Sequence, residues 1–148
     1  MPPARFLVFL LAGVLLFFGV GPAKAESAGL LVPHIWEIPD GAWVKPWNGA
    51  CEEASIMMVN GFYLNSPRTI VSRTKSKALM SPLFAIENKL FGYNTDTNAT
   101  ETQKIINDFS VFEAEIVRSP TLADITNELS FGHPVISLHY GYDLNNPR

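Results

Sequence analysis

The apolar residues of the chain follow a helical spacing over most of its length. Between residues 50 and 63, Cys51, Ala54, Met58 and Phe62 recur every three or four positions, so they share one face of a predicted helix. The same spacing, with start and stop signals, predicts four more helices: one before Met80, one over 81–90, one over 100–109, and one from Thr121 to Gly132.

Two later segments have the pattern of strands instead. Residues 111–117 alternate, with Phe112 and Ile116 on one side and glutamates on the other, which is typical of a strand with one wet face. Residues 135–138 form a continuous apolar run and are predicted as a buried strand.

Local signals set the expected ends of these elements. Proline does not fit inside a helix, so Pro82 is expected to begin a new helix after a break. Thr100 and Gln103 have the spacing of a capping box at a helix start. Asn48 is a possible cap for the helix that follows it, and Glu52 and Glu53 would complement the positive end of that helix dipole.

The first 25 residues have the organisation of a secretory signal. Arg5 precedes a continuous apolar run of 15 residues, Phe6 to Val20, and Ala23-Lys24-Ala25 matches a small-x-small cleavage site. The run is shorter than the roughly 20 residues of a membrane span, although an uncleaved anchor is the alternative. We therefore expect residues 1–25 to be a signal peptide, residues 30–148 to form one domain, and the protein to be secreted or held at the cell surface.

Charge and cysteine content narrow the possible functions. Without Arg5 and Lys24 the chain keeps 9 of its 11 basic residues against 14 acidic ones, a balance of −5, which disfavours nucleic acid and anionic membranes as partners. Membrane contact is expected only through an uncleaved signal. One cysteine cannot form an internal disulfide, so it pairs with another chain or is kept for chemistry. No cofactor is indicated, and the weak calcium-loop spacing over residues 94–101 lacks the required glycine.

Cys51 is the candidate nucleophile because it stands at the start of a predicted helix. The helix dipole would lower the pKa of its thiol, and the first backbone N–H groups could hold an oxyanion. Glu52 and Glu53 oppose that effect, so a histidine partner would be needed, and His139 at the end of the 135–138 run is the candidate base. The alternatives are an inert buried cysteine and a histidine without catalytic duty.

A loop before Cys51 offers candidate substrate contacts. Trp43, Trp47 and Asn48 are close together in it and could line a groove; alternatively, the tryptophans cap the core beside the helix.

Several motifs resemble one known family. The most specific is the block from Ala50 to Ser55, Ala-Cys-Glu-Glu-Ala-Ser; it is preceded by Val32-Pro33, Pro39, Gly41, Trp43 and Pro46-Trp47, and followed by Phe91-Gly92-Tyr93, Gly132-x-Pro-Val-Ile and Asn145-Asn146-Pro147. Over about Leu31 to Arg148 this resembles secreted bacterial cysteine peptidase-like domains ("C thirty-nine-like"), relatives of the peptidase that trims double-glycine leaders from bacteriocins.

The resemblance implies a papain-like α+β fold, with helices packed on an antiparallel sheet and incomplete at the C-terminus. It implies thiolate attack by Cys51 on a peptide or amide carbonyl, an acyl-enzyme and hydrolysis by water. Glu37 stands where many relatives carry a glutamine oxyanion donor, and an ionised carboxylate cannot donate a hydrogen bond. The family's usual catalytic histidine would lie beyond Arg148.

Two functions follow from these residues. The first is a cysteine peptidase that acts on a peptide or protein substrate outside the cytoplasm, with acyl transfer as a weaker variant. In that case Cys51 should alkylate faster than a model thiol. This fragment is expected to be inactive because it lacks the downstream histidine. The second is a non-catalytic papain-like module that binds peptide or cell-wall material. Replacing Cys51 by Ala would separate the two, because only hydrolysis needs the thiol.

Overall fold

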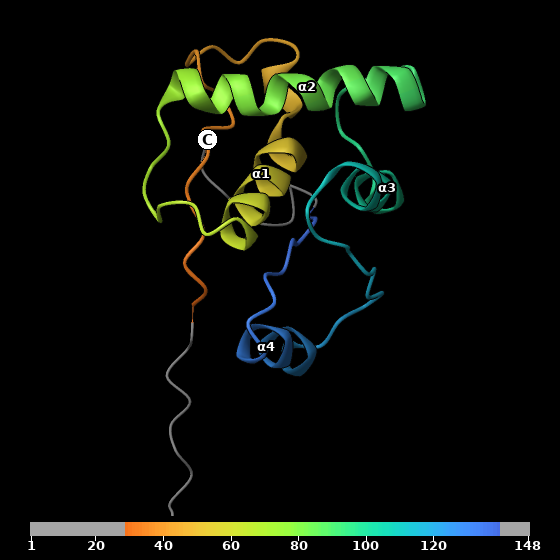
Figure 1. Ribbon diagram of the computed structural model, residues 1–148. Coiled ribbons are helices and arrows are strands. Elements are labelled where there is room, and N and C mark those ends of the chain that lie inside the picture. Colours follow the sequence, from red (N-terminus) through yellow and green to blue (C-terminus); the bar gives the residue numbers. More distant parts are fainter. Residues whose placement is uncertain (1–28, 140–148) are drawn as a thin grey trace, which may run out of the picture.

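The computed structural model describes residues 29–139, and these residues are mainly helical. A short 3₁₀ helix, η1 (Trp47–Gly49), leads into α1 (Cys51–Tyr63), and three more helices follow: α2 (Arg73–Phe91), α3 (Ala99–Phe109) and α4 (Leu122–Ser130). Figure 1 shows that α2 lies across one end of α1 and that α3 lies beside the far part of α2. Helix α4 is set apart from these three helices. Helix α2 contacts both α1 and α3.

The predicted papain-like α+β fold is wrong for this part of the chain. Residues 29–139 contain no strand, and their β-pairing is one isolated parallel bridge between His34 and Ile70. The 111–117 segment keeps its predicted alternation, since Phe112, Ala114 and Ile116 are half-buried and the residues between them are exposed.

Helix α3 supplies the bonds that a neighbouring strand would have provided. The Ala114 N–H donates to the Asn107 side chain at 2.7 Å, and the Ala114 carbonyl accepts from Gln103 at 2.8 Å. Residues 135–138 were predicted to be a buried strand, and they are neither a strand nor buried as a run: Val135 and Leu138 are exposed, and Ile136 alone packs against the core.

The break expected at Pro82 is absent, and α2 runs through that proline as one helix. A proline inside a helix costs about 3 kcal/mol. Met80, Leu83 and Phe84 on either side of it are buried, and burying such a side chain stabilises by roughly 1.5–3 kcal/mol, so packing exceeds the local cost. Ser72 caps the start of α2, and Gly92 ends it in the left-handed conformation at φ 82°.

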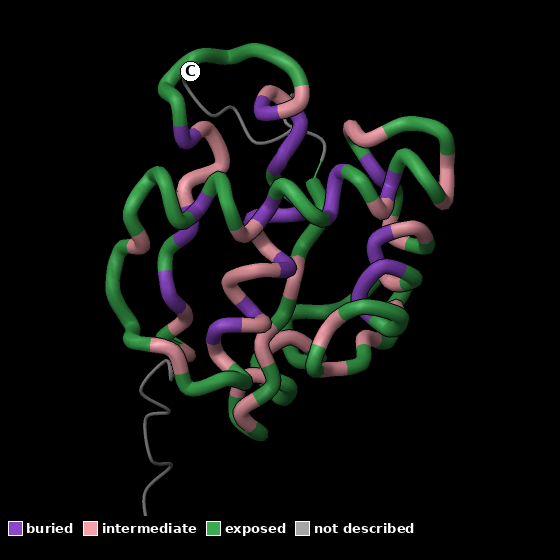
Figure 2. Tube along the Cα trace, turned by 45° about the horizontal axis from the view of Figure 1, so that its top comes forward, coloured by how far each residue is buried: buried purple, intermediate pink, exposed green. Residues whose placement is uncertain are grey.

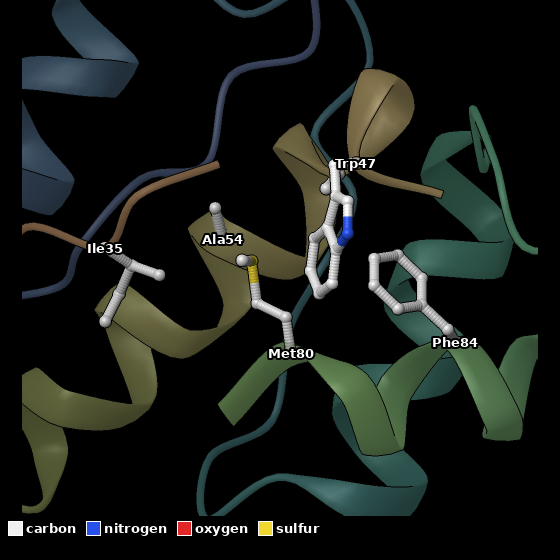
Figure 3. Close-up of a cluster of buried hydrophobic side chains, with 6 residues drawn as sticks. Ile35, Trp47, Ala54, Met80 and Phe84 are labelled. Atoms are coloured by element: carbon white, nitrogen blue, oxygen red, sulfur yellow. The ribbon is translucent and has the colours of Figure 1, made fainter. Parts of the chain in front are cut away.

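The core lies where the first three helices meet. One cluster contains six buried residues, drawn in Figure 3: Ile35, Trp47, Ala50, Ala54, Met80 and Phe84. A second joins α1, α2 and α3 through Ile56, Leu83, Ile105 and Ile106. Figure 2 shows buried positions on these helices and on the lead-in to α1, whereas α4 has none.

The segment before α1 is fixed by contacts at the far end of that helix. The His34 N–H donates to the Thr69 carbonyl at 3.1 Å, and the Val71 N–H donates to the His34 carbonyl at 2.9 Å. Pro33 lies directly over Gly61, so closely that a Cβ at residue 61 would be 2.5 Å from Pro33 Cγ.

Capping boxes begin the last two helices. Asn98 with Glu101 caps α3, and Thr121 with Asp124 caps α4. The predicted box at Thr100 and Gln103 was therefore placed two residues late, because Gln103 is used on the 111–117 segment instead. No helix in the described part of the chain is long and apolar enough to cross a membrane, and the predicted signal at residues 1–25 lies outside the described residues.

Candidate functional site

Cys51 is the first residue of α1, at the helix start that the sequence predicted, and it is exposed. The residue before it, Ala50, occupies the N-cap position and supplies no side-chain hydrogen bond. Asn48 is therefore not the cap; it belongs to the preceding η1 turn and is half-buried. The first N–H groups of α1 thus receive no side-chain cap.

The Cys51 thiol is paired with a carboxylate. Its Sγ donates to Oε2 of Glu52 at 3.0 Å. Desolvation, followed by that hydrogen bond and the charges of Glu52 and Glu37, raises the pKa of Cys51 to about 12. The group is consequently a neutral thiol at physiological pH, contrary to the activated thiolate that the helix start alone suggested.

Glu37 lies in the same neighbourhood, so two of the predicted catalytic residues are brought together. Burial, and then the charge of Glu52, raises the pKa of the Glu37 carboxyl. Glu37 in turn raises the pKa of Cys51 through its charge. When ionised it accepts rather than donates, so it opposes both a thiolate and an oxyanion.

The described histidines have other partners. The Nε2 of His139, the candidate base, pairs with the Ser137 hydroxyl at 2.7 Å, and the Nδ1 of His133 pairs with Glu128 at 2.8 Å. The His34 ring packs edge-on against Trp36. Within residues 29–139 the thiol of Cys51 therefore has a carboxylate partner and no histidine partner.

The two tryptophans of the predicted substrate groove have different environments. Trp47 is 7% exposed and packs edge-on against Phe84, with ring centroids 5.1 Å apart, as Figure 3 shows. Trp43 is 58% exposed in the loop before η1. Trp47 is thus a core residue, which was the alternative weighed from the sequence. Asn48 has a buried Oδ1 without a hydrogen-bond partner.

Two adjoining hollows lie at the opposite end of α1. An apolar one of about 350 Å³ lies between the 33–35 lead-in, the end of α1 and the start of α2, where Ile35, Met57, Leu79 and Lys75 line it. A more polar one of about 400 Å³ is lined by Leu31, Phe62, Tyr63, Asn65, Ser66 and Arg68. Ser66 lines both hollows, so they are neighbours, and we refer to the two together as the α1-end groove.

The sequence analysis assigned no role to residues 64–70, so it did not predict this groove. The available signal was the pair of apolar residues that flank the loop, Leu64 and Ile70. They are 60% and 67% exposed, and both line the apolar hollow.

Two cations at the groove are free of ion pairs. Among the ion pairs of the described residues, none involves Arg68 or Lys75. By contrast, Lys77 pairs with Asp40 at 2.6 Å, and the Arg73 guanidinium donates to the Ile38 and Pro39 carbonyls. The described residues contain no cluster of three or more metal-ligating side chains.

Comparison of the chain with protein-family models, with curated proteins and with solved structures finds no match in any of the three. The candidate site rests on the geometry of residues 29–139.

Proposed function

We propose that the chain is a peptide-binding module whose α1-end groove receives an extended peptide bearing an apolar side chain and a carboxylate. The observation that carries this proposal is the pair of neighbouring hollows, one apolar and one more polar, that share Ser66 as a lining residue. Ligand sites are typically concave, mostly apolar and provided with a few placed polar groups.

The apolar half of the groove supplies the affinity. Leu31, Leu64 and Ile70 stand at the groove with 60%, 60% and 67% of their surface exposed. Covering such surface is favourable by roughly 25 cal/mol per Å². A peptide side chain that enters the hollow beside Ile35 and Leu79 would remove this apolar surface from water.

The walls of the groove are held in place before any peptide arrives. Pro33 is fixed over Gly61, and two backbone hydrogen bonds join His34 to the 69–71 segment. A preformed groove loses little conformational freedom on binding, so more of the contact energy becomes affinity.

The charges at the groove select the chemistry of the peptide. Arg68 and Lys75 flank it without carboxylate partners among the described residues, although the whole chain has a net charge of −3. A guanidinium binds a carboxylate through two parallel hydrogen bonds, which favours an acidic side chain or a C-terminal carboxylate near Arg68.

The test is peptide binding by groove variants. We expect full-length protein to bind a fluorescent pool of peptides in which Leu or Phe neighbours Asp or Glu. Ile70→Glu should weaken binding by about tenfold or more, because it removes apolar surface and repels the ligand carboxylate. Arg68→Ala should weaken binding of the acidic peptides and leave the matching amide-capped Asn and Gln peptides unaffected.

Leu122→Glu is the matched control, since Leu122 is 77% exposed on α4, away from the groove. Equal binding by Ile70→Glu and the wild type, or binding that Leu122→Glu weakens equally, would remove the proposal.

A second function, a cysteine hydrolase, is favoured by one observation: an exposed thiol at an uncapped helix start. It needs a base from outside the described residues, placed so that it displaces Glu52 from the thiol. Cys51→Ala should then abolish cleavage of groove-binding peptides while their binding persists. Cleavage that survives in Cys51→Ala would exclude this function without affecting the first.

A further inference from the structure

Two glutamates are fully buried where α1 crosses α2. Glu53, in the first turn of α1, is 1% exposed, and Glu87, in the last turns of α2, is 0% exposed. Neither takes part in an ion pair among the described residues. Burial of a carboxylate without a cation is costly, so such a pair requires an explanation.

The unmatched atoms in this pair are all hydrogen-bond acceptors. Oε2 of Glu53 and both side-chain oxygens of Glu87 are buried without a hydrogen-bond partner. A proton on Glu53 would turn that carboxyl into a donor for Glu87, and so would give one of these acceptors a partner. The two carboxyls could thus be paired by a shared proton, without a further side chain.

The charged groups around the pair reinforce that conclusion. Glu52 on α1 acts on both glutamates, Glu101 on α3 acts on Glu87, and the Tyr93 hydroxyl in the α2–α3 connection is itself influenced by Glu87. All of these groups are acidic. The start of the α1 dipole, through the backbone N–H groups, is the one favourable influence on an ionised Glu53.

We propose that the Glu53–Glu87 pair is a proton-dependent joint, which holds the first turn of α1 against α2 while it keeps a proton and releases that turn when both carboxyls ionise. Cys51 and Glu52 belong to the same turn, so release would also free the thiol from its present surroundings. The joint is independent of the α1-end groove, which lies at the other end of the helix.

The direction of the pH dependence follows from the pKa values. Burial is the largest cause that raises the pKa of both carboxyls in the folded protein above the ordinary 4.5. A raised folded-state pKa gives stability that is complete below pH 4.5 and is lost as the pH rises through the folded-state values. The fold is therefore expected to weaken from acidic to alkaline pH.

Thermal unfolding of the full chain tests the joint. The wild-type melting temperature should fall by roughly 5 °C or more between about pH 5 and pH 8, whereas the isosteric double variant Glu53→Gln/Glu87→Gln should show little of that fall. The control Glu113→Gln/Glu115→Gln changes two exposed glutamates and should melt like the wild type at every pH. An equal fall in the Glu53/Glu87 double variant overturns the proposal.

Two further measurements keep the test decisive. Infrared spectra of the wild-type protein at pH 7 should contain the C=O band of a protonated carboxyl. The absence of this band would overturn the proposal even if the double variant does not fold. It would indicate an ionised pair with a bound cation. Amide exchange of residues 52–56 should accelerate with pH more in the wild type than in the double variant. Equal acceleration would exclude local release of the α1 start.

Discussion

Desolvation and a hydrogen bond to its sequence neighbour Glu52 together set what the lone thiol of Cys51 can do. A helix start normally favours a thiolate, but desolvation and the neighbouring carboxylates act in the opposite sense and raise the pKa to about 12. The residue usually taken as the mark of reactivity is here a hydrogen-bond donor.

Glu52→Gln tests this account at the scale of one residue. It removes the negative charge closest to the thiol, so the pKa of Cys51 should fall, although desolvation still keeps it raised. Each pKa unit recovered increases the thiolate fraction about tenfold. We expect iodoacetamide to alkylate the variant faster than the wild type near pH 8, followed by mass spectrometry.

Glu113→Gln provides the control, because it removes an exposed carboxylate from another part of the chain and should leave the rate unchanged. A wild-type Cys51 that reacts as fast as free cysteine near neutral pH would contradict the raised pKa.

At this scale the sequence predicted some of the site and missed the rest. The position of the lone cysteine at a helix start followed from local patterns, and Glu37 was singled out through the family resemblance. The burial of Glu53 did not, because a glutamate in a first helical turn is usually a solvated partner of the dipole. Its environment is set by Glu87, which lies 34 positions later, and no spacing rule connects two such distant residues.

Among the helices, α1 carries a glycine that its own propensity does not explain. Gly61 costs a helix about 1 kcal/mol relative to alanine. The structure explains it, since the Pro33 ring occupies the place of its missing Cβ. Gly61→Ala should therefore destabilise the protein by about 1–2 kcal/mol, because overpacking costs typically 1–3 kcal/mol and exceeds the propensity gain. Urea unfolding monitored by circular dichroism would measure it.

Ser81→Ala serves as the comparison on an exposed helix position, where the change should lie within about 0.5 kcal/mol. If Gly61→Ala proved more stable than the wild type, Pro33 would not be seated as described.

The helices that sequence patterns predicted well have an apolar stripe that no proline interrupts; capping residues also marked the starts of α3 and α4, whereas α1 has no side-chain cap. Helices α1, α3 and α4 began within about two residues of their expected starts. Helix α2 was split in two because the propensity of Pro82 was weighed without the burial of its neighbours, which only tertiary contacts supply. The predicted alternation of buried and exposed residues over 111–117 is present, but the segment is bonded to α3 rather than to a strand.

In the molecule as a whole, packing is concentrated in α1, α2 and α3. Helix α4 has no buried residue. Leu122, its first residue, is 77% exposed, and Phe131, which follows its last residue, is 74% exposed. The α+β expectation came from the family resemblance, alongside two predicted strands. Alternation in a sequence identifies a half-buried extended segment, but it does not say whether a neighbouring backbone or side chains will satisfy the hydrogen bonds of that segment. Neither the α1-end groove nor the Glu53–Glu87 joint could be anticipated, as each is formed by segments that meet only on folding.

The seating of Pro33 on Gly61 also determines how the domain would carry mechanical load. Tension applied at the N-terminal side of residue 29 reaches the core first through this contact and through the two backbone hydrogen bonds of His34. A pull from that side would therefore load the end of α1 around Gly61 before it loads the turn that carries Cys51.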